Sequence, residues 1–146
     1  MKRVIGILPL LLIMCYSPIL AMTFTVNGLT YETIDNNLNV YVAPPVSGTH
    51  YSGSISVESS VYYEGRTYTV KAIGKNEFAE TSDYTGARLT SIDIDNSIEK
   101  IDDSAFRNCT GLTSVEIPNR TTEIGVSAFE GCSSMTKVTL GSILLK

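Results

Sequence analysis

Residue types that commonly carry catalysis or bind metal ions are scarce in this sequence. There is one histidine, no tryptophan and three cysteines. His50 lies in Ser47-Gly48-Thr49-His50-Tyr51, which predicts an exposed loop, and no cysteine or second histidine stands near it as a partner for metal binding or general-base chemistry. Ser127 lies in Gly125-Val126-Ser127-Ala128-Phe129, which lacks the second glycine of a nucleophile elbow, and no histidine is available to activate it. We therefore expect no enzyme, no cofactor and no metal site.

Two cysteines lie 23 residues apart, at Cys109 and Cys132. Each follows a phenylalanine, Phe106 or Phe129, at the same spacing, so we place both cysteines at apolar positions of a repeated unit. We expect two buried free thiols. A disulfide between them is the alternative, because neighbouring units bring the sulfur atoms close and an exported protein meets oxidising conditions.

Acidic side chains alternate with apolar ones at Asp93 and Asp95, which flank Ile94. This alternation predicts that both carboxylates point to solvent from a strand, and Glu116 should lie beside Asp93 on the next unit. A strip of carboxylates suits a hard cation such as calcium. We favour the simpler interpretation of a solvated strand face, and keep these three residues as possible ligand-facing positions.

Tyrosines are concentrated near the N-terminus, and five of them lie between residues 22 and 65. Tyrosine forms strands well, and it is also enriched at recognition surfaces because it offers a large rigid contact with a polar tip. A structural role is the expected one, with binding as the alternative. The ligand-facing candidates among them are Tyr31, Tyr41, Tyr51 and Tyr62.

The segment that carries these tyrosines has no lysine or arginine and has the pattern of short strands and turns. Phe24-Thr25-Val26 and Val40-Tyr41-Val42 have period-two patterns, and turn residues such as Asn27-Gly28 and Pro44-Pro45 separate such stretches. We predict a small β cap over residues 22–54, which would cover the open N-terminal end of the remaining fold.

The rest of the chain is an internal repeat with a period of 23 residues. Residues 89–111 and 112–134 align without gaps and agree at 10 of 23 positions, and a third copy, 135–146, stops after its first strand. Upstream, residues 55–88 form an irregular unit in which Ile73 and Phe78 keep the repeat's Ile-to-Phe spacing. We therefore divide the chain into a cap and repeats over 55–146.

The repeated apolar positions predict a solenoid. Leu89, Ile92 and Ile94 recur one period later as apolar residues, and the last two alternate with polar ones, as in a strand with one buried face. One unit of this size cannot bury its apolar side alone, whereas stacked units bury a continuous column. Phe106 and Phe129 should stack inside that column.

At these positions the sequence resembles the BspA-like, or treponemal-type, leucine-rich repeats of bacterial surface proteins, whose pattern is LxxIxIPxxVxxIGxxAFxxCxx. The resemblance implies a mainly β fold: a right-handed leucine-rich-repeat solenoid with short parallel strands and short helical turns at Ser104-Ala105-Phe106, displayed outside the cell and often linked to adhesion. The departures are Asp95 and Gly141 at the proline position of Pro118, Asp102 at the glycine position of Gly125, and Thr121 at the position of Ile98.

Residues 1–21 have the form of an export signal. Lys2 and Arg3 precede an apolar run that is broken by Pro9, and Ala21 offers a cleavage site. Bulky Ile13 and Met14 before Cys15 argue against a lipoprotein signal. Without this segment the chain has 9 basic and 15 acidic residues, a net charge of −6, which argues against nucleic-acid binding, and no other apolar run is long enough to span a membrane.

We therefore expect a secreted or cell-surface, non-enzymatic module that recognises an extracellular protein or glycan. The alternative is a truncated structural fragment of a longer repeat protein, with no ligand of its own. The third copy leaves apolar residues beside an unpaired strand edge, so end-to-end self-association is a further expectation.

Overall fold

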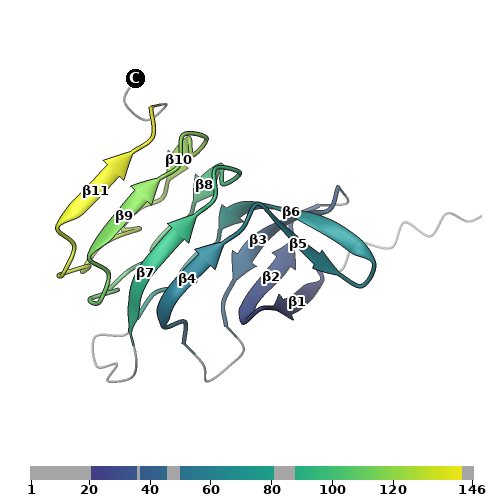
Figure 1. Cartoon of the computed structure of the whole chain (residues 1–146), viewed down its shortest axis with the longest axis horizontal. Helices are drawn as coiled ribbons and strands as arrows, with labels where there is room; N and C mark the ends of the chain where they lie inside the picture. Colours follow the sequence, from purple (N-terminus) through teal and green to yellow (C-terminus); the bar gives the residue numbers. More distant parts are fainter. Residues whose placement is uncertain (1–20, 36, 46–49, 81–87, 143–146) are drawn as a thin grey trace, which may run out of the picture.

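The computed structural model describes residues 21–35, 37–45, 50–80 and 88–142, and these form a mainly β fold with no helix (Figure 1). The export segment predicted at residues 1–21 lies outside the described residues, except for Ala21. Among the described residues, no helix is long and apolar enough to cross a membrane. The strands, in chain order, are β1 (Thr23–Val26), β2 (Leu29–Thr33), β3 (Asn39–Ala43), β4 (Gly53–Val57), β5 (Ser60–Tyr63), β6 (Arg66–Ile73), β7 (Leu89–Ile94), β8 (Lys100–Ile101), β9 (Ser114–Ile117), β10 (Glu123–Ile124) and β11 (Lys137–Leu140).

The first face of the coil is built from the longer strand of each repeat. β4 pairs in parallel with β7, and β9 pairs in parallel with β11, while β7 and β9 lie side by side between them (Figure 1). Apolar residues alternate with polar ones in these strands, so Ile92 and Ile94 are buried whereas Asp93 between them is exposed. We call this surface the strand face.

The second face is one sheet that runs from the cap into the coil. β1, β2 and β3 are antiparallel, β3 then pairs in parallel with β6, and β6, β8 and β10 continue in parallel. β5 adds to β6 on the N-terminal part of that strand. The cap is therefore an extension of the coil's own sheet. In addition, β4 crosses the boundary that we predicted between residues 54 and 55, because its residues already pair with β7.

The column between the two faces is filled as the repeat predicts. Ile98, Ile101 and Phe106 are fully buried. The rings of Phe78, Phe106 and Phe129 are nearly parallel, with successive centroids 5.0 Å apart. The predicted stack is thus confirmed, and it extends one unit further toward the N-terminus through Phe78.

The segment expected to be a short helical turn is a series of hydrogen-bonded turns. Asn76, Ser104 and Ser127 occupy one repeat position, and each has a left-handed backbone with φ of 61°, 55° and 57°. A residue in that region interrupts right-handed helical geometry. Alternate amide groups of these turns bond to the next coil, and the amides between them bond within the turn: Phe106 N donates to Ala128 O at 2.7 Å, whereas Arg107 N donates to Ser104 O at 3.0 Å.

Candidate functional site

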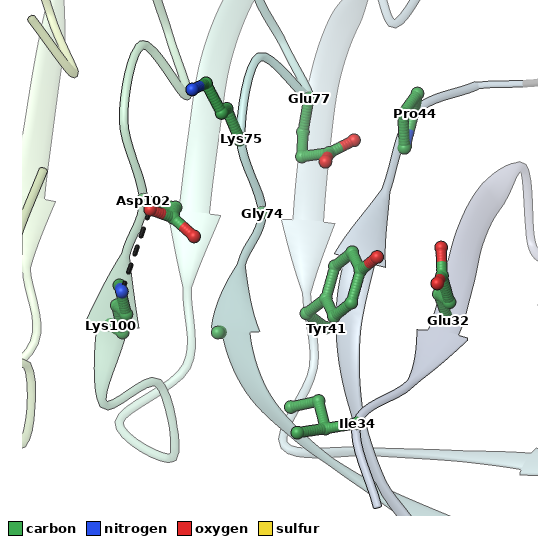
Figure 2. A pocket seen from close by; sticks show the side chains of 10 residues that line it. Glu32, Ile34, Tyr41, Pro44, Gly74, Lys75, Glu77, Lys100 and Asp102 are labelled. Atoms are coloured by element: carbon green, nitrogen blue, oxygen red, sulfur yellow. Dashed lines mark ion pairs between the residues drawn. The ribbon is translucent and has the colours of Figure 1, made fainter. Parts of the chain in front are cut away.

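A groove of about 530 Å³ opens where the cap meets the first coil, on the sheet that the two share (Figure 2). We call it the junction groove. Its lining comes from β2, β3, β6, β8 and the segments that directly follow these four strands: Glu32, Ile34, Tyr41, Pro44, Ala72, Gly74, Lys75, Glu77, Lys100 and Asp102.

The register of four strands creates this groove. Glu32 is paired with Tyr41, Tyr41 with Ala72, and Ala72 with Lys100, so these residues form one row across β2, β3, β6 and β8. Directly paired residues point to the same side of a sheet. Because alanine is the small member of the row, a hollow remains between the tyrosine ring and the lysine. The groove is therefore a product of strand pairing between the cap and the coil.

Glu77 forms part of the groove wall and is 4% exposed. Gly74 makes room for it, because a Cβ at residue 74 would come within 2.5 Å of Glu77 Oε1 and within 2.7 Å of the Tyr41 ring. Glu77 Oε2 has no hydrogen-bond partner. Burial, followed by the negative charges of Glu32 and Asp102, raises the pKa of Glu77 to about 8. The carboxyl group is therefore protonated at neutral pH.

The repeat shows how unusual this glutamate is. Glu77 occupies the position of Ala105 and Ala128 in the two full repeats, and both alanines are buried. Glu77 was not among the candidate residues predicted from the sequence, because residues 55–88 were treated as an irregular unit. A glutamate at the alanine position, immediately before Phe78, was the signal that would have identified it.

Charges are distributed unevenly over the groove (Figure 2). At the coil side, Lys100 lies 3.7 Å from Asp102 and 3.1 Å from Glu123, and Lys75 lies 3.9 Å from Asp103. At the cap side, Glu32 takes part in none of the ion pairs found among the described residues. Burial, a hydrogen bond with Glu32 and the negative charges of Glu32 and Glu77 raise the pKa of the Tyr41 hydroxyl.

A smaller hollow of about 220 Å³ adjoins the junction groove and shares Pro44 and Glu77 with it. His50 and Tyr51 line this hollow. His50 is exposed, as the loop interpretation predicted. The structure therefore brings the one histidine of the chain to the surface that also contains Glu77.

The four tyrosine candidates fall into two groups. Tyr31 and Tyr51 belong to the core, with 4% and 7% exposure, so little of either side chain is at the surface. The Tyr51 hydroxyl donates to Ala43 O and accepts from Thr30 N, each at 2.9 Å. Burial, followed by the nearby Tyr51 and Glu58, raises the pKa of Tyr31 to about 12. By contrast, Tyr41 lines the junction groove and Tyr62 is 67% exposed on β5.

The acidic candidates do not form one strip. Asp93 and Glu116 are exposed on the strand face and line a hollow of about 260 Å³ together with Asn96 and Asn119. Asp95 follows the end of β7, and its carboxylate accepts a hydrogen bond from Ser97 N at 2.7 Å, so it stabilises a turn. Within the described ranges, no three acidic, histidine or cysteine side chains are grouped as a metal site would require.

Both cysteines are free in the structure. Cys109 is buried, whereas Cys132 is only half-buried because it belongs to a later coil. Cys109 Sγ donates to Phe78 O at 2.9 Å, and Cys132 Sγ donates to Phe106 O at 3.1 Å. Hydrogen bonding with Cys132, together with burial, raises the pKa of the Cys109 thiol. The thiols thus link each coil to the preceding one as hydrogen-bond donors.

Comparisons with known proteins agree with this architecture. The family model described as the BspA type leucine rich repeat region (6 copies) matches residues 71–146 of this chain. A leucine rich cell surface protein from Faecalibacterium prausnitzii is similar in structure, with 26% identity and a TM-score of 0.62 over 82% of this chain and 32% of that one. No curated protein matches the chain.

Two further solved structures show the same fold. The pneumococcal vaccine antigen PcpA is 19% identical, with a TM-score of 0.53 over 84% of this chain and 39% of PcpA. A leucine-rich repeat protein from Bacteroides capillosus is 20% identical, with a TM-score of 0.53 over 81% of this chain and 97% of that protein. The chain thus spans about a third of the length of the Faecalibacterium protein and somewhat more of PcpA.

Proposed function

Because the chain belongs to the BspA-type leucine-rich-repeat family, we propose that it is an exported, non-enzymatic module that recognises an extracellular protein or glycan at the cell surface. The export signal predicted at residues 1–21 and the similarity to a protein described as a cell surface protein support the location. The scarcity of residues for nucleophilic or metal chemistry supports a binding role.

The observation that carries this proposal is the junction groove. It is concave, it combines apolar and aromatic lining with a few polar groups, and it contains a buried carboxyl oxygen without a partner. Ligand sites on proteins usually have this composition. The strand face is exposed and polar, and its hollow of about 260 Å³ is only about half as large as the junction groove.

A binding screen of the purified protein against extracellular-matrix proteins and glycans tests the proposal. The variant Ala72→Phe fills the groove, and Thr67→Phe, at an exposed position of the same strand outside the groove, is the matched control. We expect a captured ligand to be lost with Ala72→Phe and kept with Thr67→Phe, with equal circular dichroism spectra for both. A ligand that both variants retain would exclude the groove as the recognition site.

A second role, as one segment of a longer stacked array, is favoured by a different observation. The last coils expose apolar side chains whose counterparts in earlier coils are buried, with Ile124 at 37%, Val138 at 51% and Leu140 at 42% exposure. Another repeat of the same kind would cover them. Further 23-residue units in the reading frame downstream would support this role, and their absence would count against it.

A further inference from the structure

We propose that the junction groove binds a basic side chain, lysine or arginine, presented by an extracellular protein, with Glu32 and Glu77 as its counter-charges. This inference rests on the proposed recognition function and adds the chemistry of the ligand. It starts from the carboxyl group of Glu77, which the fold itself does not require.

Packing alone needs only alanine where Glu77 stands. Ala105 and Ala128 fill the same position in the following coils and are 0% and 3% exposed. A glutamate there is buried to the same degree, and its Oε2 lacks a hydrogen-bond partner. A buried polar atom without a partner destabilises the folded state. A ligand that donates a hydrogen bond to the carboxyl group removes that cost.

The surroundings of Glu77 suit a cation on a long apolar stem. Figure 2 shows the Glu77 carboxyl group, the Tyr41 ring and the Glu32 carboxylate around the same space, with Ile34 and Pro44 at its sides. The carboxylates would pair with the charged head, and a tyrosine ring attracts a cation over its face. The methylene stem of lysine or arginine would lie against the apolar side chains.

The coil side of the groove does not oppose this assignment. Lys100 is already paired with Asp102 and Glu123, and Lys75 lies near Asp103 with 64% of its side chain exposed. The cap side has no lysine or arginine, because residues 22–65 contain none. The long-range attraction is also favourable, since the chain without its predicted export segment has a net charge of −6.

Binding of a cation should be linked to the loss of a proton. Glu77 is protonated at neutral pH in the free protein, and a cation favours the ionised form. The affinity should therefore rise with pH, by about tenfold or more between about pH 6 and about pH 9, because the fraction of protein with Glu77 ionised rises over that range. The other titratable or charged groups that face Glu77 from the elements around it are Glu32, Tyr41, His50, Lys75, Glu80, Lys100 and Asp102.

The test is an NMR titration of the purified protein with the peptide acetyl-Gly-Arg-Gly-amide. The peptide in which neutral citrulline replaces arginine is the matched control for charge, and N-acetyllactosamine represents a glycan. We expect the arginine peptide to shift groove resonances and the citrulline peptide to bind at least about tenfold more weakly, as loss of a charge-assisted pair predicts.

Four variants locate the site. Glu77→Ala introduces the residue that the other repeats have at this position, so this variant should fold normally. Both Glu77→Ala and Glu32→Gln should weaken the binding of the arginine peptide by about tenfold or more. Asp93→Asn removes the same charge from the strand face and should leave binding unchanged. His50→Gln should retain the pH dependence, whereas Glu77→Ala should abolish it.

The outcomes separate the two proposals. Specific binding of N-acetyllactosamine in the groove, without binding of the arginine peptide, would overturn the cation assignment and leave the recognition function standing. Equal binding of the arginine peptide by the protein and by Glu77→Ala would overturn the assignment as well. If neither probe binds and the matrix screen also finds no ligand, both the assignment and the recognition function fail.

Discussion

At the scale of single residues, the most informative position is Glu77, because the repeat provides an internal reference for it. The same backbone environment contains alanine in two later coils, so the difference between the coils is the carboxyl group itself. Its neighbours explain how it is accommodated: Gly74 has no side chain to occupy the space, and Tyr41 covers the group from the cap. The first coil therefore differs from the others at the point where the cap creates a groove.

The raised pKa of Glu77 predicts a dependence of stability on pH. The pKa of Glu77 is about 8 in the folded protein and near 4.5 when unperturbed. The contribution of the protonated carboxyl group to the free energy of unfolding is therefore fully present below about pH 4.5 and is lost as the pH rises through about 8. This side chain alone should lower the free energy of unfolding by about 3–5 kcal/mol across that range. Urea denaturation of the protein and of Glu77→Gln, repeated over this range, measures the difference. Parallel pH profiles for the two proteins would contradict the buried, protonated state.

Phe106 and Asp93 test the assignment of inner and outer positions. Phe106 is fully buried between two other rings, so Phe106→Ala should cost about 3–5 kcal/mol of unfolding free energy. Asp93 is exposed on the strand face, so Asp93→Ala should change it by less than about 0.5 kcal/mol. Denaturant midpoints provide the measurement, and comparable shifts for both variants would show that the faces are assigned wrongly.

At the scale of the elements, the turns matter as much as the strands. Each coil has a turn at the end of its second strand, where the chain passes very close to the preceding coil. At Gly125 a Cβ would come within 2.4 Å of Asp103 N and within 2.5 Å of Asp102 C. Both atoms belong to the backbone, which is itself hydrogen-bonded, since Gly125 N donates to Ile101 O at 2.8 Å. The spacing of the coils at this point depends on the missing side chain.

Gly125→Ala should therefore destabilise the stacking of the last complete coil. We expect a loss of about 1–3 kcal/mol, the usual cost when a methyl group is forced into a packed site. Val126→Ala is the control. Because the adjacent Val126 is 76% exposed, this substitution should change the free energy of unfolding by less than about 0.5 kcal/mol. Thermal and denaturant unfolding of the two variants give the comparison, and a Gly125→Ala protein as stable as the parent would show that the coils can separate freely here.

At the scale of the whole molecule, the two ends of the described coil differ. At the N-terminal end the antiparallel strands β1, β2 and β3 continue the sheet and cover the core. At the other end, β11 pairs only with β9 among the described strands, and every residue of β11 is exposed. An exposed strand edge beside apolar side chains is a template for adding another chain or another repeat.

We therefore expect the purified chain to associate end to end through β11, or to fray over about its last ten residues, and an added capping repeat to suppress both. Light scattering reports the molar mass of the two proteins, and amide hydrogen exchange reports the protection of β11. A monodisperse monomer with strong protection throughout β11 in the uncapped protein would contradict this expectation.

Export is the other prediction at this scale. Lys2, Arg3 and the apolar run before Ala21 predict that the mature protein begins at or near Met22. N-terminal sequencing of the protein recovered from the medium or the cell surface measures the cleavage point. A mature chain that still begins at Met1 would remove the support for both export and surface display.

The sequence by itself determined the repeat and its interior. The sequence predicted the 23-residue period, the burial of Ile92 and Ile94 and the stacking of Phe106 on Phe129. These features were predictable because each repeat has the same local pattern of apolar residues, and stacking of the coils brings equivalent residues into contact. Only the tertiary structure decided where the groove lies and which candidates line it. Tyr41 and Tyr51 are both ligand-facing candidates in the sequence, yet the parallel pairing of β3 with β6 puts Tyr41 beside Ala72 and in one row with Lys100, whereas the Tyr51 hydroxyl bonds within the cap. The register between distant strands depends on which apolar faces meet in three dimensions, and no periodicity within either strand specifies it.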